Sequence, residues 1–307
     1  MEYQKLGSTD LTVSRIGFGC WAMGGYGWGK IDDKESIAAV HKALDLGINF
    51  FDTADVYGFG RSEEVLSKAL GLYRNKVIIA TKFGVKWNKK GETSKDISPK
   101  RLAEALDGSL KRLKIDCIPF YQVHWPDFKT PISETMEALK KYQKAGKIRY
   151  IGCSNFSVKL IKEAQKFSRI ESLQAPYNIK EREIEKELIP CAKKYKMGVI
   201  TYSTLIQGLF TGKYEENSKF RKDDVRSRYE NWIGEKFEKN LKIVEKLKKL
   251  SDFYKKTPAQ IAIRWVLDNN NITSALIGIQ KPEQVKENIG AIDWKLSEKD
   301  RINLAKF

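Results

Sequence analysis

The sequence predicts an α/β protein folded as a (β/α)8 TIM barrel with a short N-terminal β-hairpin. Eight short apolar runs rich in Val, Ile, Tyr and Phe recur along the 307 residues, and amphipathic stretches separate them. The repeat is roughly 38 residues long, the size of one strand–helix unit in such a barrel. With 41% hydrophobic residues the chain can build a large core, which excludes wholesale disorder.

These two patterns set the order of the elements. Residues 3–6 and 11–13 flank a Gly-Ser turn, and we expect them to form a hairpin that closes the N-terminal end of the barrel. The predicted barrel strands are 15–19, 48–52, 77–82, 117–124, 150–154, 172–176, 198–203 and 274–278. The predicted helices are 33–46, 62–71, 98–113, 131–145, 157–167, 183–196 and 236–268. Ser-Pro at 98–99 and Thr-Pro at 130–131 and 257–258 each supply an N-cap followed by proline, so a further helix starts within the last range.

A doubly wound nucleotide-binding sheet is the main alternative fold. Residues 17–22 read G-F-G-C-W-A and match G-x-G-x-x-A, but a glycine-rich loop follows instead of a helix, so we reject a Rossmann signature. No linker rich in Pro, Gly or Ser divides the chain, and we therefore expect one domain over 1–307. The irregular stretch 203–234 is too long for a simple connection and is expected to be a functional loop.

Composition narrows the possible functions. The chain has 56 Lys and Arg against 39 Asp and Glu, a formal net charge of +17. Acids alternate with bases in the lysine-rich stretches, so we interpret them as solvated helix surface and expect no specific nucleic-acid partner. Two histidines and four cysteines without a C-x-x-C pair argue against a metal site and a disulfide framework. Because no secretory or membrane-spanning apolar stretch is present, we expect a cytoplasmic protein that does not bind membranes.

Titratable residues stand where three successive strands end. The strands end in Asp52, Lys82 and His124, and Tyr57 follows Asp52 in the adjoining loop. Catalytic groups of such barrels lie at these carboxyl ends, and buried strands rarely carry charge there without a task.

These four residues suggest a chemistry. A lysine beside a tyrosine hydroxyl favours the phenolate, so we expect the Tyr57 pKa to lie below its ordinary value of about 10. Asp52 would keep Lys82 charged, and neutral His124 would orient a carbonyl oxygen towards Tyr57. The set can protonate oxygen but supplies no electrons, so a reduction would need a hydride donor such as a nicotinamide cofactor.

Six segments carry a resemblance to a known family. They are GINFFDTADVYGFGRSEEVL, VIIATKFG, FYQVHWPD, GKIRYIGCSNFS, ITYSTLIQGLFTGKY and IGIQKPEQVKENIGAID. Over residues 3–293 the chain resembles the aldo-keto reductases. The sequences of these segments are closer to the bacterial and potassium-channel β-subunit-like branch than to the mammalian aldose reductases. The resemblance implies a catalytic tetrad of Asp52, Tyr57, Lys82 and His124. It also implies NADPH-dependent reduction of aldehydes or ketones to alcohols, with Tyr57 as the general acid.

The same resemblance implies the cofactor and substrate contacts. Ser154, Asn155 and Gln174 would bind the nicotinamide carboxamide, and Tyr202 would stack on the ring. The other expected cofactor contacts are Trp21, Asp52, Ser203, Leu205, Gln207, Gly208, Lys213, Arg226, Gly278, Gln280, Lys281, Gln284, Glu287 and Asn288. The loop 203–234 would fold over the cofactor and slow its release. The expected substrate pocket consists of Trp21, Tyr57, Trp87, His124 and Trp125.

Two departures from the family pattern bear on these expectations. Thr204 stands where relatives often have proline, and Gln280 stands where a basic residue commonly meets a 2′-phosphate, although Lys281 follows. We expect NADP(H) to be preferred, NAD(H) to be possible and no metal to be needed. The competing hypothesis is a regulatory or sensor subunit that binds NADP(H) with little turnover. The sequence indicates a small carbonyl compound as substrate but does not identify it, and it leaves the oligomeric state open.

Overall fold

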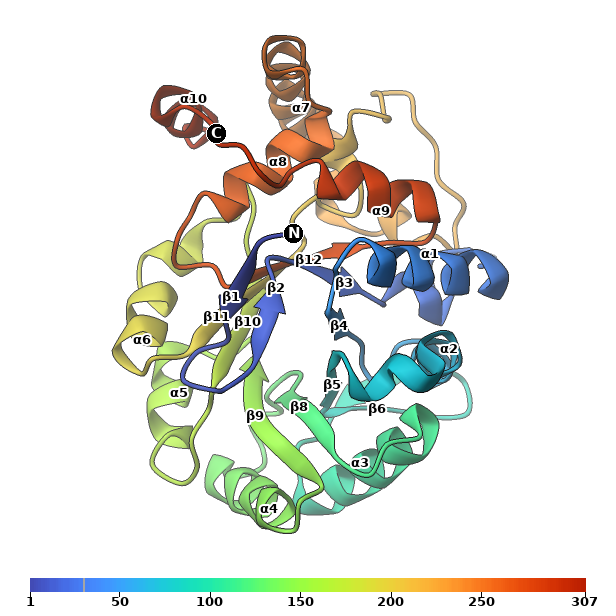
Figure 1. Ribbon diagram of the computed structural model, residues 1–307, viewed down its shortest axis with the longest axis vertical. Helices are drawn as coiled ribbons and strands as arrows, with labels where there is room; N and C mark the ends of the chain where they lie inside the picture. Colours follow the sequence, from blue (N-terminus) through green and yellow to red (C-terminus); the bar gives the residue numbers. More distant parts are fainter. Residues whose placement is uncertain (30) are drawn as a thin grey trace.

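Eight parallel strands form a closed barrel surrounded by helices (Figure 1) in the computed structural model, which describes residues 1–29 and 31–307. The barrel strands are β3 (Ile16–Gly19), β4 (Phe50–Asp52), β5 (Ile78–Phe83), β8 (Ile118–Val123), β9 (Ile148–Ser154), β10 (Ser172–Pro176), β11 (Gly198–Tyr202) and β12 (Ser274–Gly278). β12 pairs back onto β3, with Leu276 opposite Gly17, and so closes the ring. The predicted (β/α)8 barrel is confirmed, and β3 leads into a loop as the rejection of a Rossmann motif required.

Helices connect the strands on the outside of the barrel. Those between consecutive strands up to β11 are α1 (Asp33–Asp45), α2 (Arg61–Leu70), α3 (Pro99–Leu113), α4 (Ile132–Lys144), α5 (Val158–Ala164) and α6 (Leu188–Lys194). Between β11 and β12 lie α7 (Gly234–Tyr254) and α8 (Pro258–Leu267), and after β12 come α9 (Pro282–Ile289) and α10 (Glu298–Leu304). Ser98 and Thr257 cap α3 and α8 through their side chains, as predicted.

Several sequence-based assignments were wrong in detail. Residues 183–196 do not form one helix, because the ring of Pro190 cannot accommodate a helical carbonyl four residues earlier, so α6 starts only at Leu188. Thr130 does not cap α4, since its hydroxyl donates to Asp127 Oδ2 at 2.7 Å instead. No helix was predicted at α9 or α10, and no strand at the hairpin of β6 (Val85–Trp87) and β7 (Thr93–Lys95).

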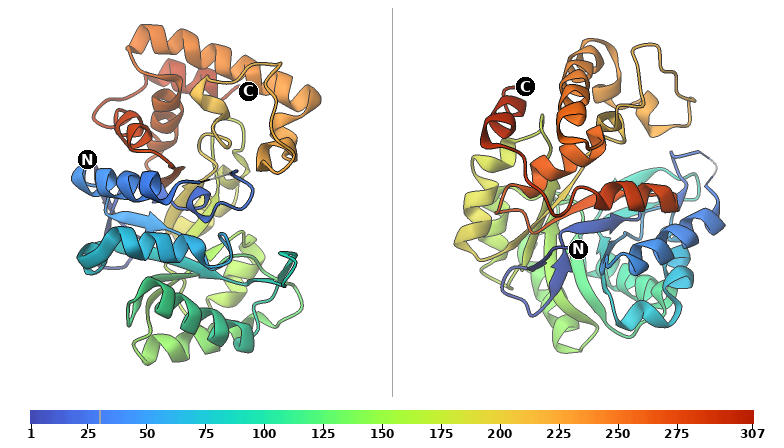
Figure 2. Two further views of the ribbon diagram at one scale, coloured as in Figure 1. Left: turned by 90° about the vertical axis from the view of Figure 1, so that its right-hand side faces the viewer. Right: turned by 45° about the horizontal axis from the view of Figure 1, so that its top comes forward.

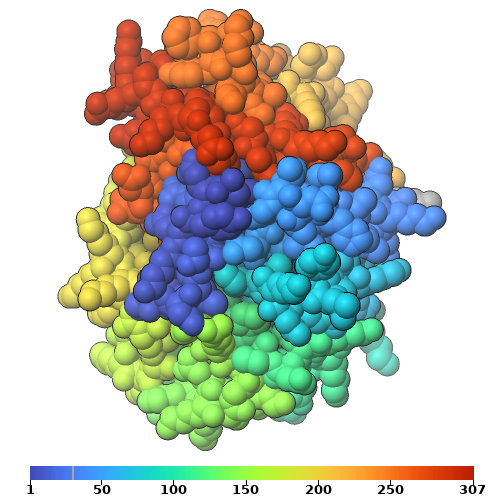
Figure 3. Space-filling view, in the orientation of Figure 1, coloured from blue at the N-terminus to red at the C-terminus, as the bar shows by residue number. Residues whose placement is uncertain are grey.

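The N-terminal hairpin covers one end of the barrel. Its strands β1 (Tyr3–Lys5) and β2 (Thr12–Ser14) pair antiparallel, and its residues cover the middle of the face seen in Figure 3. Leu6 is fully buried in the cluster that fills the barrel, together with Phe50 and Phe120. Gly7 has φ +58°, and a Cβ there would lie 2.5 Å from the Glu171 carbonyl oxygen, so glycine is required for this close approach.

The loop 203–234 lies at the opposite end. It and the β6–β7 hairpin project away from the N-terminal hairpin in the left view of Figure 2. Up to Ile233 it contains the 3-10 turns η4 (Leu209–Thr211), η5 (Val225–Ser227) and η6 (Glu230–Trp232). The Val225 amide donates to the Gly27 carbonyl at 2.7 Å, which ties this loop to the loop after β3. Over the described ranges, no helix has the length and apolar character needed to cross a membrane.

The buried hairpin leucine should contribute measurably to stability. Leu6→Ala should lower the free energy of unfolding by about 2–5 kcal/mol, because it leaves a cavity between the hairpin and the barrel core. The exposed Thr12→Ala on β2 is the matched control and should change it by no more than about 0.5 kcal/mol. Urea unfolding measures both, and equal effects would show that the hairpin is not part of the core.

Candidate active site

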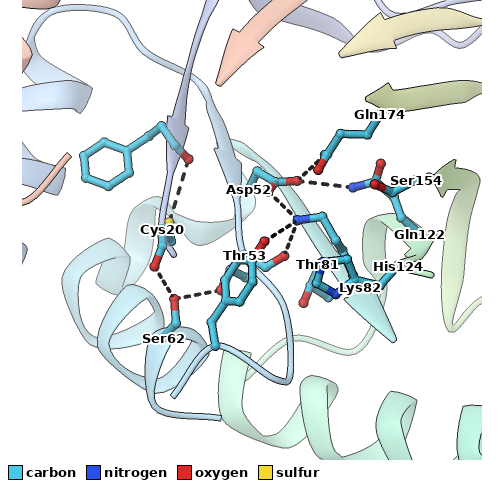
Figure 4. A network of polar contacts seen from close by, with 12 residues as sticks. Cys20, Asp52, Thr53, Ser62, Thr81, Lys82, Gln122, His124, Ser154 and Gln174 are labelled. Atoms are coloured by element: carbon cyan, nitrogen blue, oxygen red, sulfur yellow. Dashed lines mark hydrogen bonds and ion pairs between the residues drawn. The ribbon is translucent and has the colours of Figure 1, made fainter. Parts of the chain in front are cut away.

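A buried ion pair lies at the centre of the site. Lys82 Nζ contacts Asp52 Oδ1 and donates to the Thr53 carbonyl at 3.0 Å. Gln122 Nε2 and Gln174 Nε2 donate to Asp52 Oδ2 at 3.2 and 2.8 Å. Figure 4 shows the side chains of Lys82, Gln122 and Gln174 converging on Asp52 from three other strands, β5, β8 and β10. The register explains part of this, because Lys82 on β5 lies opposite Gln122 on β8.

Tyr57 lies beside this pair, and its pKa is shifted in the direction opposite to the predicted one. Lys82 Nζ is 3.4 Å from the Tyr57 hydroxyl and 5.1 Å from the centre of its ring. Nevertheless, burial raises the Tyr57 pKa well above 10, and the negative charge of Asp52 raises it further. The expectation of a lowered Tyr57 pKa was therefore wrong. The sequence indicated the lysine, but burial and the carboxylate have the larger effect, so Tyr57 is a neutral phenol.

His124 is the second neutral group. Its ring centre is 5.7 Å from that of Tyr57, and its Nδ1 is buried without a hydrogen-bond partner among the described residues. Burial, and secondarily the charge of Lys82, hold the His124 pKa well below 6.5. The imidazole is thus neutral at physiological pH, as the sequence analysis expected.

The residues expected to hold a nicotinamide lie next to the ion pair. Asn155 follows β9 with φ +60° and donates from Nδ2 to the His124 carbonyl and to Ser154 Oγ, both at 3.0 Å. Tyr202, at the end of β11, donates to Asn155 Oδ1 at 2.7 Å. Gln174 is committed through its amide nitrogen to Asp52. Hydrogen bonds and strand register therefore connect the four predicted residues to one another, and Gln174 connects them to Asp52.

The loop after β11 has a strained backbone. Ser203, Ile206, Gln207 and Gly208 all have positive φ, between 45° and 94°. A β-branched residue such as Ile206 rarely adopts this conformation, and such strain often marks ligand-binding turns. Gln207 Nε2 donates to Ser203 Oγ at 3.3 Å, whereas Leu205 packs against the main core.

Five of the expected cofactor contacts lie just before or along α9, namely Gln280, Lys281, Gln284, Glu287 and Asn288. Gln284 Oε1 accepts from the amides of Gln280 and Lys281 at 2.7 and 3.0 Å. Lys281 Nζ lies 3.1 Å from Glu35 on α1, and Lys213 Nζ lies 3.9 Å from Glu287. Asn288 is buried on the same helix, and Gly278 is exposed beside open space. Both lysines thus face carboxylates.

Arg226 is held inside its own loop. Its guanidinium pairs with Asp224 at 2.6 Å, contacts the Tyr214 hydroxyl and lies 4.5 Å from the centre of the Phe220 ring. Its charge is therefore already balanced, and its contact with a cofactor phosphate stays a prediction.

The three predicted pocket tryptophans do not lie together. Trp21 is 6.3 Å from Tyr57, ring centre to ring centre. Trp87 instead packs against Phe59 at 5.6 Å, and Trp125 lies under Lys95 Nζ at 4.6 Å.

Sequence reasoning missed three further residues of the site. Trp28 and Tyr229 contact Trp21, with ring centres at 5.1 and 6.4 Å, but nothing in the sequence singled out these two residues within their loops. Gln122 could have been found as a polar residue inside the apolar run FYQVH.

The arrangement can polarise and protonate an oxygen atom. A neutral phenol and a neutral imidazole flank a lysine whose charge is balanced by a carboxylate. Within residues 1–29 and 31–307, no group of three or more His, Cys, Asp or Glu side chains could hold a metal ion.

Comparisons with known proteins identify the family of this chain. A family model described as the Aldo/keto reductase family matches residues 15–306. The chain is 41% identical to the aldo-keto reductase YhdN of Bacillus subtilis, over 99% of this chain and 92% of that one. It is 36% identical to an NADH-specific methylglyoxal reductase of Escherichia coli, over 98% of this chain and 96% of that one. The solved structure of a glycerol dehydrogenase from Gluconobacter oxydans superimposes with a TM-score of 0.91 at 38% identity, covering 99% of this chain and 94% of that one. With the family model spanning nearly its whole length, the chain belongs to the aldo/keto reductase family and is an oxidoreductase of carbonyl compounds.

Proposed function

We propose that the protein reduces aldehydes or ketones to alcohols with NADPH, and that Tyr57 is the general acid. The observation that carries the proposal is the Tyr57 hydroxyl 3.4 Å from Lys82 Nζ, next to a neutral His124. A protonated phenol at neutral pH is the form that can donate a proton, so the raised Tyr57 pKa supports this direction of proton transfer.

The residues at the mouth of the barrel fit a nicotinamide cofactor. Asn155 and the 203–208 segment adopt strained backbone conformations, and His124 Nδ1 is buried without a described partner. Ser154, Asn155, Gln174 and Tyr202 would hold the nicotinamide end, Ser203 to Gly208 the phosphates, and the start of α9 the adenine end. When bound, the cofactor supplies the hydride.

The chain's own residues would orient the carbonyl group and supply the proton. His124 would orient the carbonyl oxygen towards Tyr57, which gives up its proton as the oxygen gains negative charge. Lys82 stabilises the phenolate left behind, since its ammonium group faces the Tyr57 oxygen. Asp52 keeps Lys82 charged and fixed in place. Trp21, Tyr57 and His124 would line the substrate pocket, since the Tyr57 ring lies next to both of the others. The roles of Trp87 and Trp125 in the pocket stay predictions.

The cofactor preference depends on one lysine that is already paired. Lys281 is the basic residue expected to meet a 2′-phosphate, and it lies 3.1 Å from Glu35. A 2′-phosphate must therefore compete with this carboxylate, so we propose a preference for NADPH that leaves NADH usable. The loop 203–234 would cover the bound cofactor, since Val225 already joins it to Gly27.

Removing the Tyr57 hydroxyl tests the reaction. Tyr57→Phe should lower kcat for aldehyde reduction by about 10²–10⁴-fold, the usual contribution of a general acid. Cofactor binding, followed by nicotinamide fluorescence, should stay within threefold. Loss of absorbance at the reduced-nicotinamide band measures turnover over a panel of aldehydes and ketones. Tight cofactor binding with negligible turnover in the wild type would instead favour the sensor hypothesis.

The neutral state of His124 predicts a dependence of stability on pH. The His124 pKa is well below 6.5 in the folded chain, whereas in the unfolded chain the imidazole binds a proton below about pH 6.5. The unfolded state therefore binds more protons, and the free energy of unfolding falls as the pH falls. The wild type should therefore lose stability relative to His124→Gln below about pH 6.5, by at most about 1.4 kcal/mol per pH unit. Urea unfolding of both proteins between pH 5 and 8 measures the difference, which should be constant above pH 7.5. A constant difference throughout would contradict a buried neutral imidazole.

The Lys281–Glu35 pair predicts opposite effects of two substitutions on the KM for NADPH. Lys281→Met should raise the KM for NADPH about tenfold, the loss of one charge-assisted contact, and leave that for NADH unchanged. Glu35→Gln should lower the KM for NADPH only. Lys286→Met, an exposed lysine on the same helix, is the matched control and should change neither. Equal effects on both cofactors would rule out a 2′-phosphate contact.

A further inference from the structure

A buried carboxylate lies in the loop that carries Tyr57. Asp55 stands two residues before Tyr57 in the segment that joins β4 to α2, and it is fully buried. Its Oδ2 contacts Nη2 of Arg101, whose own side chain is only 12% exposed. The side-chain partner of Asp55 is Arg101 and not Lys82 or His124. The proposed mechanism therefore assigns Asp55 no role.

Arg101 joins this loop to two other parts of the fold. It lies in the first turn of α3, where its amide is capped by Ser98 Oγ at 3.3 Å. Nη2 also donates to the Val85 carbonyl of β6 at 3.2 Å, and the guanidinium lies 5.2 Å from the centre of the Trp87 ring. One side chain therefore connects the Tyr57 loop, the α3 terminus and the β6–β7 hairpin.

The hairpin contacts the same loop again on the other side of Tyr57. The Trp87 ring packs at 5.6 Å against that of Phe59, and Phe59 has φ +59°. In the hairpin turn, a Cβ on Gly91 would lie 3.3 Å from the Phe59 ring. Tyr57 is thus placed between two residues, Asp55 and Phe59, that are both fixed by the hairpin or by Arg101.

Burying the Asp55 carboxylate is energetically unfavourable. Burial raises the Asp55 pKa to about 7 although Arg101 opposes the shift, and Glu63 on α2 adds to it. Arg112 on α3 also faces Asp55, and the Tyr121 hydroxyl on β8 is buried nearby without a described partner. Buried ion pairs are often no more stable than apolar replacements, so stability alone does not account for the pair.

We propose that Asp55 and Arg101 are positioning residues: their buried pair, fastened to the β6–β7 hairpin, holds residues 53–60 so that the Tyr57 hydroxyl stays within reach of Lys82. The inference rests on the proposed function, because it takes Tyr57 as the acid. Displacing such a group by about 1 Å can slow a reaction 10²-fold without changing binding.

Hydrogen exchange tests the positioning without any turnover. The amides of Asp55, Tyr57 and Phe59 donate within this region, to Lys82, Ala54 and Val56. Asp55→Asn and Arg101→Met should each speed exchange in peptides covering 53–60 by at least tenfold. The matched control is Asp268→Asn, which breaks an equally buried pair with Arg264, 2.9 Å long, on α8. It should speed exchange around 264–272 and leave 53–60 unchanged.

Kinetics tests the consequence for the reaction. Both variants should lower kcat by about 10- to 100-fold, with the KM for a small aldehyde and the cofactor Kd within threefold. The double variant should be no slower than the slower single one, because both changes break the same contact. Arg101→Lys, which keeps the charge, should recover part of kcat, and its comparison with Arg101→Met decides the question if Asp55→Asn does not fold. Asp268→Asn should leave kcat unchanged.

Four results would overturn the proposal. These are unaltered exchange at 53–60, a loss confined to KM, multiplied effects in the double variant, or an equal fall of kcat in Asp268→Asn. If the wild type reduces no carbonyl compound at all, the proposed function fails, and the exchange experiment still decides whether the pair holds the loop.

Discussion

The active end of the barrel depends on the ion pair between Asp52 and Lys82. Both side chains are almost completely excluded from water, and two unpaired charges there would each cost several kcal/mol. The surrounding strands compensate, because Gln122, Gln174 and the Thr53 carbonyl satisfy the remaining lone pairs and protons. Removing either charged partner would therefore leave the other one buried and unbalanced among these groups.

The same pair reinforces the effect of burial on the pKa values of its neighbours. Lys82 adds to the effect of burial on His124, and Asp52 adds to the effect of burial on Tyr57. Both neighbours are therefore neutral, although one of them contacts a cation. A site with one balanced ion pair and two neutral hydrogen-bonding groups can meet a carbonyl compound without first losing or gaining a proton.

Local patterns in the sequence were enough to predict much of this. The alternation of apolar runs and amphipathic stretches predicted the barrel, and the strand ends identified Asp52, Lys82 and His124. The sequence could not show how far burial would outweigh the charge of Lys82 at Tyr57, because that balance depends on the packed surroundings. Nor could it show that Arg101, 46 positions after Asp55, would turn towards it, or that Trp28 and Tyr229 would meet Trp21. The β6–β7 hairpin was missed because each strand has only three residues and β7 is entirely polar.

The contact between Lys281 and Glu35 bears on how the cofactor preference of such a protein could evolve. The pair joins α9 to α1 at the surface, and both side chains are about half exposed, so its loss would cost the fold little. It lies on elements that contribute none of the four groups around Asp52 and Tyr57. If this pair governs the choice between two nucleotides as proposed, a lineage could exchange one for the other by a single surface substitution. Its chemistry and its folding would be inherited unchanged.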